Sequence, residues 1–96
     1  MEDPRPPSRF RASPDIVDRR IDEEVVLVHL TTNRIYVLNR TAARLWDLLC
    51  AGHERDEILR LMLQEFDVTE AHLTNEIEDL LISMTRDQLI TPYETS

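Results

Sequence analysis

The sequence predicts an α+β domain in which three antiparallel strands come first and three helices follow. Between residues 16 and 38, short runs of β-branched and apolar residues alternate with connections of only a few residues, the pattern of an antiparallel meander. After residue 40, apolar residues recur at intervals of three and four, which is typical of amphipathic helices. The chain has 96 residues, 42% hydrophobic and 31% charged, enough for one domain with one core.

The ends of the chain are predicted to form two tails. Residues 1–15 hold four of the five prolines and almost no periodic apolar residues. Because proline fixes φ and removes a backbone donor, we expect residues 1–15 to form an extended, mobile N-terminal tail. The folded domain then spans residues 16–91, and residues 92–96 form a C-terminal tail.

Three strands are expected in the first part of the domain. The first is Ile16–Ile21, and the second is Glu24–Leu30, which is β-branched and apolar on both faces, as in a central, well-covered strand. The turn Thr31–Asn33 leads into the third strand, Arg34–Leu38. Such short connections imply the order 1-2-3, so the third strand lies at an edge of the sheet.

Asn39 separates the third strand from the first helix. Its side-chain oxygen can accept a hydrogen bond from the next turn, which makes it a strong N-cap. Gly52 stands where a residue in the left-handed conformation ends a helix. The predicted buried face of this helix consists of Ala42, Leu45, Trp46 and Leu49.

Two further helices are expected. The second covers about residues 54–66, with Asp56 and Glu57 near its positive end. Thr69 is the predicted N-cap of the third helix, which reaches about residue 87. The predicted buried faces are Ile58, Leu59, Met62, Leu63 and Phe66 in the second helix, and Leu73, Ile77, Leu80, Leu81 and Met84 in the third. The resulting order β-β-β-α-α-α is winged-helix-like, with its strands at the front.

The chemistry-bearing residues do not indicate an enzyme. Cys50 is the only cysteine, so an internal disulfide and a cysteine-based zinc site are excluded, and we expect it to pack as a small buried hydrophobe. The chain has no lysine and a single glycine, which excludes Schiff-base chemistry and glycine-rich phosphate loops. His29, His53 and His72 lack metal-site spacing. We therefore expect no catalytic residues, no metal and no cofactor.

Charge and hydropathy restrict the partners. The net charge of -8 repels nucleic acid and anionic membrane surfaces. The longest aliphatic run, Val25–Val28, is far too short to cross a bilayer, and the N-terminus contains no signal-peptide core. We expect a cytoplasmic protein.

Two features favour binding. The third strand offers an unpaired row of N–H and C=O groups to another extended chain. On a helical wheel of the third helix, Ile82 falls outside the core face and, beside an open strand edge, would form one wall of an apolar groove. The stripe along that border of the core face is Thr74, Glu78, Leu81, Ile82 and Thr85.

The stretches VLVHLTTNRIYVLNRTAARLWDLLCAG, ILRLMLQEFDV and EIEDLLISMTRDQLI together resemble the PqqD-like family. Members of this family are the precursor-peptide recognition elements of ribosomally made, modified peptides. The resemblance covers roughly residues 16–91. Its most specific part is the hydrophobic strand, the Leu38-Asn39 junction and the following helix with Leu45, Trp46 and Gly52.

The resemblance implies three strands, three helices and a non-catalytic function. Such proteins bind the leader segment of a precursor peptide, which adds as a further strand beside the third strand and lies against the third helix. On this sequence the paired strand is Arg34, Ile35, Tyr36, Val37 and Leu38, and the third helix supplies the wall. The implied partners are the precursor and a biosynthetic enzyme, either a radical SAM enzyme or a leader peptidase.

The sequence departs from the family pattern at two places. The turn TTNR lacks the proline–glycine type of sequence associated with the pyrroloquinoline quinone pathway member. An element that serves a lasso-peptide protease therefore fits the sequence about as well as one that serves a radical enzyme. Arg86-Asp87-Gln88 stand where many relatives place a glycine, so the third helix is expected to end differently. Two alternatives stay open: a winged-helix nucleic-acid-binding protein, and a small adaptor or dimerisation subunit. Both a monomer and a dimer formed through the free edge are compatible with the sequence.

Overall fold

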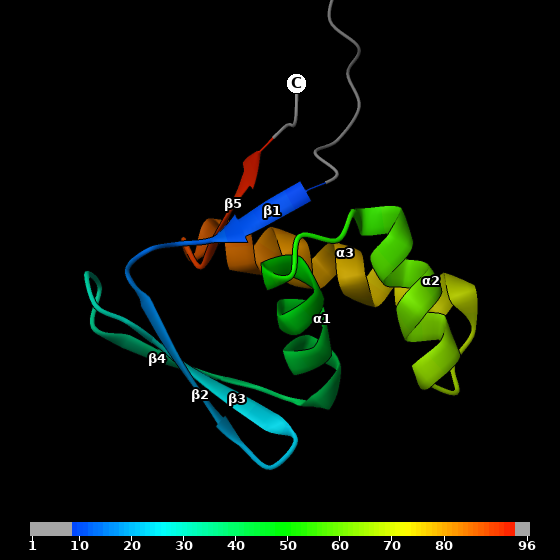
Figure 1. The fold of residues 1–96 in the computed structure, drawn as a ribbon, viewed down its shortest axis with the longest axis horizontal. Coiled ribbons are helices and arrows are strands. Elements are labelled where there is room, and N and C mark those ends of the chain that lie inside the picture. The colour runs from blue at the N-terminus through cyan, green and yellow to red at the C-terminus, as the bar shows by residue number, and fades with distance from the viewer. Residues whose placement is uncertain (1–8, 94–96) are drawn as a thin grey trace, which may run out of the picture.

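The computed structural model describes residues 9–93 and shows a small sheet, three helices and a second pair of strands (Figure 1). The elements are β1 (Arg9–Ala12), β2 (Ile16–Ile21), β3 (Glu24–His29), β4 (Arg34–Leu38), α1 (Arg40–Cys50), α2 (Arg55–Glu65), α3 (Glu70–Arg86) and β5 (Ile90–Tyr93). The three-stranded sheet followed by three helices confirms the predicted α+β fold class.

The sheet has the strand order β2-β3-β4, with both neighbouring pairs antiparallel. In β3 the side chains of Val25, Leu27 and His29 are buried, whereas Val26 and Val28 are only half-buried. The expectation that both faces of this strand are well covered is therefore wrong. The helices cover one face of the sheet, and the alternation along β3 is that of a sheet covered on one side.

Part of the predicted N-terminal tail is a strand. β1 pairs antiparallel with β5, and Phe10 is buried in the core with 5% of its surface exposed. The backbone N–H of Ser13 donates to the carbonyl of Leu89 (2.9 Å), and the Arg9 guanidinium donates to the carbonyl of Gly52 (2.7 Å). The ordered domain thus begins before residue 16 and extends past residue 91. The tails predicted over residues 1–8 and 94–96 lie outside the described residues.

The predicted caps of α1 are confirmed. The side chain of Asn39 accepts a hydrogen bond from the N–H of Ala42 at 2.9 Å. At the other end Gly52 has φ of +91°, and the N–H groups of Gly52 and His53 donate to the carbonyls of Leu49 and Leu48. This is the Schellman arrangement, which satisfies the last carbonyls of the helix.

The helices enclose one core. The predicted buried face of α1 is confirmed at all four positions, and that of α3 at all but Leu80, which is partly buried. Of the residues predicted to be buried in α2, Ile58 and Met62 are buried, whereas Leu59, Leu63 and Phe66 are only partly buried against the core. The buried residues are Phe10, Val25, Leu27, Leu38, Ala42, Ala43, Leu45, Trp46, Leu48, Leu49, Ile58, Met62, Leu73, Ile77, Leu81, Met84, Leu89 and Ile90. Cys50, predicted to be buried, is exposed because it falls on the solvent side of the last turn of α1.

The third helix begins and ends with local capping. The Thr69 hydroxyl accepts a hydrogen bond from the N–H of His72 (3.2 Å), as predicted. At the C-terminal end, Gln88 adopts φ of +62°, and the N–H of Leu89 donates to the carbonyl of Met84 (2.9 Å). A Schellman ending therefore forms in this chain without glycine.

His29 is the one buried polar side chain of the described core, and it stabilises the β3–β4 turn. Its Nδ1 accepts hydrogen bonds from the backbone N–H groups of Thr31 (3.3 Å) and Thr32 (3.4 Å). These two contacts connect the buried imidazole to the turn that leads into β4.

Candidate functional site

The free edge of β4 is the first component of the candidate site. β4 is the last strand of the β2-β3-β4 sheet, and within residues 9–93 no other strand pairs with its outer edge. Figure 1 shows β4 running from the β3–β4 turn to the start of α1. An unpaired edge of this kind presents backbone donors and acceptors to an extended chain.

The hydrogen-bond alternation shows which residues of β4 direct their backbone groups to solvent. The N–H of Leu30 donates to the carbonyl of Asp15, on the β2 side of the sheet. Since successive residues of an antiparallel strand alternate in direction, Leu27 and His29 point their backbone groups toward β4. Their register partners, Tyr36 and Arg34, therefore bond to β3.

Ile35 and Val37 consequently direct their N–H and C=O groups to the free edge. Their side chains are the exposed aliphatic ones of the strand, with 68% and 62% of their surface accessible, and Arg34 at its start is exposed as well. Tyr36 is half-buried and Leu38 is buried, both on the face that the helices cover. In this strand Ile35 and Val37 therefore offer backbone groups and exposed aliphatic side chains, whereas Tyr36 and Leu38 anchor the strand against the helices.

The outer face of the sheet is an apolar surface that sequence reasoning missed. In the register, Val28 lies between Val17 and Ile35, and Val26 lies between Arg19 and Val37. The exposed aliphatic residues of this outer face are Val17, Ile21, Ile35 and Val37, and half-buried Val26 and Val28 lie among them. Exposed Leu30 follows in the turn after β3. The second strand is apolar on both faces, so residue type alone predicts that both are covered and does not show which face the helices leave open.

The predicted residues of α3 occupy different environments. Leu81 has only 4% of its surface exposed and belongs to the core, whereas Ile82 is 59% exposed. The Glu78 carboxylate lies 3.5 Å from the Arg55 guanidinium of α2, and the Thr85 hydroxyl donates to the carbonyl of Leu81 (2.7 Å). Thr74 is half-buried. The exposed members, Glu78, Ile82 and Thr85, therefore form one solvent-facing border of α3.

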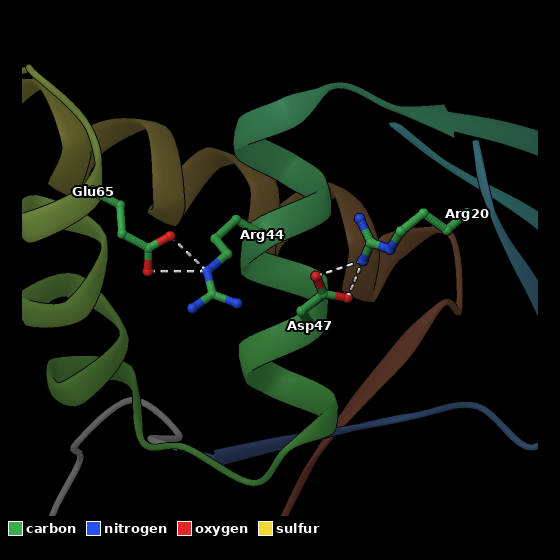
Figure 2. Close-up of polar contacts among 4 residues, drawn as sticks. All are labelled: Arg20, Arg44, Asp47 and Glu65. Atoms are coloured by element: carbon green, nitrogen blue, oxygen red, sulfur yellow. Dashed lines mark hydrogen bonds and ion pairs between the residues drawn. The ribbon is translucent and has the colours of Figure 1, made fainter. Parts of the chain in front are cut away.

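Ion pairs connect α1 to its neighbours (Figure 2). Arg20 of β2 donates to both oxygens of Asp47, at 2.5 and 2.6 Å, and Arg44 donates to both oxygens of Glu65 at the end of α2, at 2.8 and 3.0 Å. The hydrogen bond with Glu65 raises the pKa of Arg44. Together with the Arg40 guanidinium, which stacks 4.9 Å from the ring centre of Phe66, these pairs hold the sheet and α2 to α1.

The hollow between these residues does not resemble an anion site. It is a shallow depression of about 180 Å³, lined by arginine and carboxylate side chains together with Phe66. Arg20 and Arg44 are already bonded to carboxylates, and Arg40 lies on an aromatic ring. An incoming anion would have to displace these partners.

The described residues show little else that carries chemistry. In residues 9–93 no three histidine, cysteine or acidic side chains are grouped so as to hold a metal ion. None of the described helices is long and apolar enough to cross a membrane. Although Cys50 is exposed as a residue, its thiol is partly desolvated by the protein around it, and this desolvation, with the carboxylates of Asp18 and Asp47 nearby, raises its pKa to about 11. The thiol is therefore a poor nucleophile.

Comparison with known proteins gives a family model and two similar structures. The model described as coenzyme PQQ synthesis protein D (PqqD) matches residues 24–90. A structure described as TbiB1 in complex with the TbiA(beta) leader peptide is 29% identical, covers 88% of this chain and 99% of its own, and has a TM-score of 0.81. A lasso peptide synthetase B1 complexed with the leader peptide is 25% identical, with coverages of 88% and 100% and a TM-score of 0.80.

No curated protein sequence matches the chain. The family model nevertheless extends from the first residue of β3 to the first residue of β5, and so includes β4, its free edge and all three helices. This range is well over half of the 96 residues. The chain therefore belongs to the PqqD family.

Proposed function

We propose that this chain is a non-catalytic recognition element that binds the leader segment of a ribosomal precursor peptide and presents it to a biosynthetic enzyme. The observation that carries the proposal is the free edge of β4, where Ile35 and Val37 direct both backbone groups and side chains to solvent. The family membership and the leader-peptide complexes of the two similar structures support it.

The leader binds by β-augmentation. It adds as a fourth strand beside β4, and main-chain hydrogen bonds to Ile35 and Val37 supply affinity that does not depend on leader sequence. Arg34, Tyr36 and Leu38 remain bonded to β3 and fix the position of the edge. The capped start of α1 at Asn39 turns the chain away after five strand residues, which leaves the edge accessible.

The third helix supplies the wall of the groove. We assign this wall to the border of α3 that carries Thr74, Glu78, Leu81, Ile82 and Thr85, with Ile82 as its exposed apolar contact. Leu81 forms the base of this wall, since its side chain is almost fully buried and packs in the core. Side chains at alternate positions of the leader enter this groove and provide specificity.

The biosynthetic enzyme, a leader peptidase or a radical SAM enzyme, docks on the outer face of the sheet. Four exposed aliphatic side chains on one small sheet, with Leu30 in the adjoining turn, are more than isolated surface residues and mark an interaction surface. A second copy of the chain is disfavoured there because each copy has a net charge of -8. The acidic turn with Asp22, Glu23 and Glu24 at one end of the face fits a partner with basic residues beside its apolar patch.

Presentation requires no catalytic residue on this chain. When leader and enzyme are bound to the same small domain, the precursor reaches the enzyme at an effective concentration set by the tether, on the order of millimolar for short flexible links. The rate of modification then rises without any new chemistry.

An NMR titration of labelled protein tests the function. The probes are the TbiA(beta) leader peptide and the leader halves of precursors from neighbouring genes. Shifts concentrated in β4 and α3 that saturate at micromolar peptide are expected. If the spectrum stays folded and unchanged with every such peptide, the leader-binding function is wrong, and an adaptor that uses the outer face becomes the better explanation.

A further inference from the structure

We propose that this chain also selects the leader by its outward-facing residues: the bound strand carries two branched aliphatic side chains two positions apart, directly opposite Ile35 and Val37. These side chains extend the outer face of the sheet by one strand. The inference rests on the proposed function, because it concerns the leader strand at the β4 edge, and it adds a second selectivity to that of the groove.

The backbone direction determines which leader residues face outward. Ile35 and Val37 direct their N–H and C=O groups to the free edge, so an added antiparallel strand forms its hydrogen-bonded pairs with these two residues. Residues of such a pair point their side chains to the same face, with Cβ atoms about 5 Å apart. The two leader residues opposite Ile35 and Val37 therefore lie on the outer face, and the residue between them, opposite Tyr36, points toward the helices.

The side chains of β3 and β4 give an apolar environment to the two leader residues opposite Ile35 and Val37. Ile35 has Val28 beside it on the β3 side, and Val37 has Val26. On the leader side both are open, which is why 68% and 62% of their surface is exposed. A valine, isoleucine or leucine in the leader would cover this open flank, whereas a charged residue would lose hydration there without gaining a partner.

The charges of the face are placed away from this flank. Arg19 lies in the row of Val37 but two strands away, on β2. Glu24 lies on β3 in the row next to that of Val26 and Val37, so β4 separates it from the added strand. An outward polar residue of the leader would therefore meet aliphatic neighbours. Each matched aliphatic pair should contribute a factor of about two to five in affinity over alanine.

A library selection tests the inference and does not require that the leader be identified first. Random twelve-residue peptides displayed on phage are selected against the full chain, against a variant with Ile35→Thr and Val37→Thr, and against Val17→Thr as the matched control. Threonine retains the β-branched shape and strand propensity. Val17 lies on the same outer face but on the far strand, so its change leaves the β4 flank intact.

Peptides enriched on the wild-type chain and on Val17→Thr should carry two branched aliphatic residues at positions i and i+2. Peptides selected on the double variant should lose this aliphatic pair. Any residue preference at the position between the pair, which faces the helices opposite Tyr36, should be the same as on the wild-type chain. For a selected peptide, replacing one outward aliphatic residue by threonine should reduce affinity for the wild-type chain about two- to fivefold, and should have little effect with the double variant.

The outcomes separate the inference from the function. Enriched peptides without the aliphatic pair, or a pair that persists on the double variant, would overturn the inference and leave leader binding intact. If no peptide is enriched on any of the three chains while amide spectra show all three folded, both the inference and the proposed function fail.

Discussion

Gln88 ends α3 in a conformation that residues with a side chain adopt only at a cost. Its φ of +62° is stabilised by the hydrogen bonds of the Schellman ending, from Gln88 to Thr85 and from Leu89 to Met84. Left-handed backbone costs an L-residue about 1–2 kcal/mol, and glycine avoids this steric term. The hydrogen bonds and the burial of Leu89 and Ile90 thus outweigh the local cost, and a helix ending without glycine escapes sequence reasoning.

Replacing Gln88 by glycine should therefore stabilise the domain. We expect Gln88→Gly to raise the free energy of unfolding by about 1 kcal/mol, measured by urea denaturation. Gln88→Ala is the matched control, because alanine keeps the Cβ that makes this φ unfavourable. Equal stability of the glycine and alanine variants would show that the left-handed conformation is not the source of the effect.

Ile82 is the exposed apolar residue on the assigned border of α3. Ile82→Glu should weaken leader binding by about 1–3 kcal/mol, because it removes an apolar contact and introduces a charge. The thermal midpoint should stay close to that of the unmodified chain, since the side chain is 59% exposed.

Ser83→Glu provides the control for the Ile82 substitution. Ser83 is the next residue of α3 and lies about 100° further around the helix, beyond the assigned border. Titration calorimetry with the same leader peptide should show little change for Ser83→Glu. If this variant weakens binding and Ile82→Glu does not, the peptide lies along the other border.

The Cys50 thiol should react slowly in the folded protein. A pKa of about 11 leaves only about 0.1% thiolate at pH 8, whereas an unfolded cysteine with a pKa near 8.5 is about one quarter ionised. Alkylation by iodoacetamide, followed by mass spectrometry, should be at least about tenfold slower in buffer than in guanidinium chloride. Equal rates would contradict the raised pKa.

At the scale of elements, the sequence predicted those whose signals are local. Asn39, Gly52 and Thr69 mark helix ends through contacts within four residues, and each acts as predicted. β1 and β5 could not be predicted this way. Each has four residues, and each forms a strand only because the other pairs with it from the opposite end of the chain. The apolar outer face was missed because residue type does not reveal which face of a strand the helices cover.

The first helix is the element on which the others assemble. It packs against β1 of the β1–β5 pair, against β3 and β4 of the three-stranded sheet, and against α2. Trp46 lies in its buried face with 3% of its surface exposed. Trp46→Ala should lower the free energy of unfolding by about 3–5 kcal/mol, as large aromatic truncations in a core do. Chemical denaturation followed by circular dichroism measures this, and a variant as stable as the original chain would contradict the core assignment.

At the scale of the whole molecule, the domain depends on a residue from the range first predicted to be a tail. Phe10→Ala should destabilise the fold by about 3 kcal/mol, because the ring is buried against the core. Arg11→Ala is the control: its guanidinium stacks 4.3 Å from the ring centre of Tyr93 but is exposed, so about 0.5 kcal/mol is expected. Similar thermal midpoints for the two variants would place the domain boundary back near residue 16.

The pairing of β1 with β5 also brings the two ends of the described chain together. Arg9 is the register partner of Tyr93, so their Cα atoms are only about 5 Å apart. Figure 1 shows β1 beside β5. A short linker can therefore join the ends of the domain, and new termini can be opened at the exposed turn of Asp22 and Glu23. The same closeness allows the whole domain to be inserted into a surface loop of another protein with little strain on its host, a route to grafting peptide recognition onto an enzyme of choice.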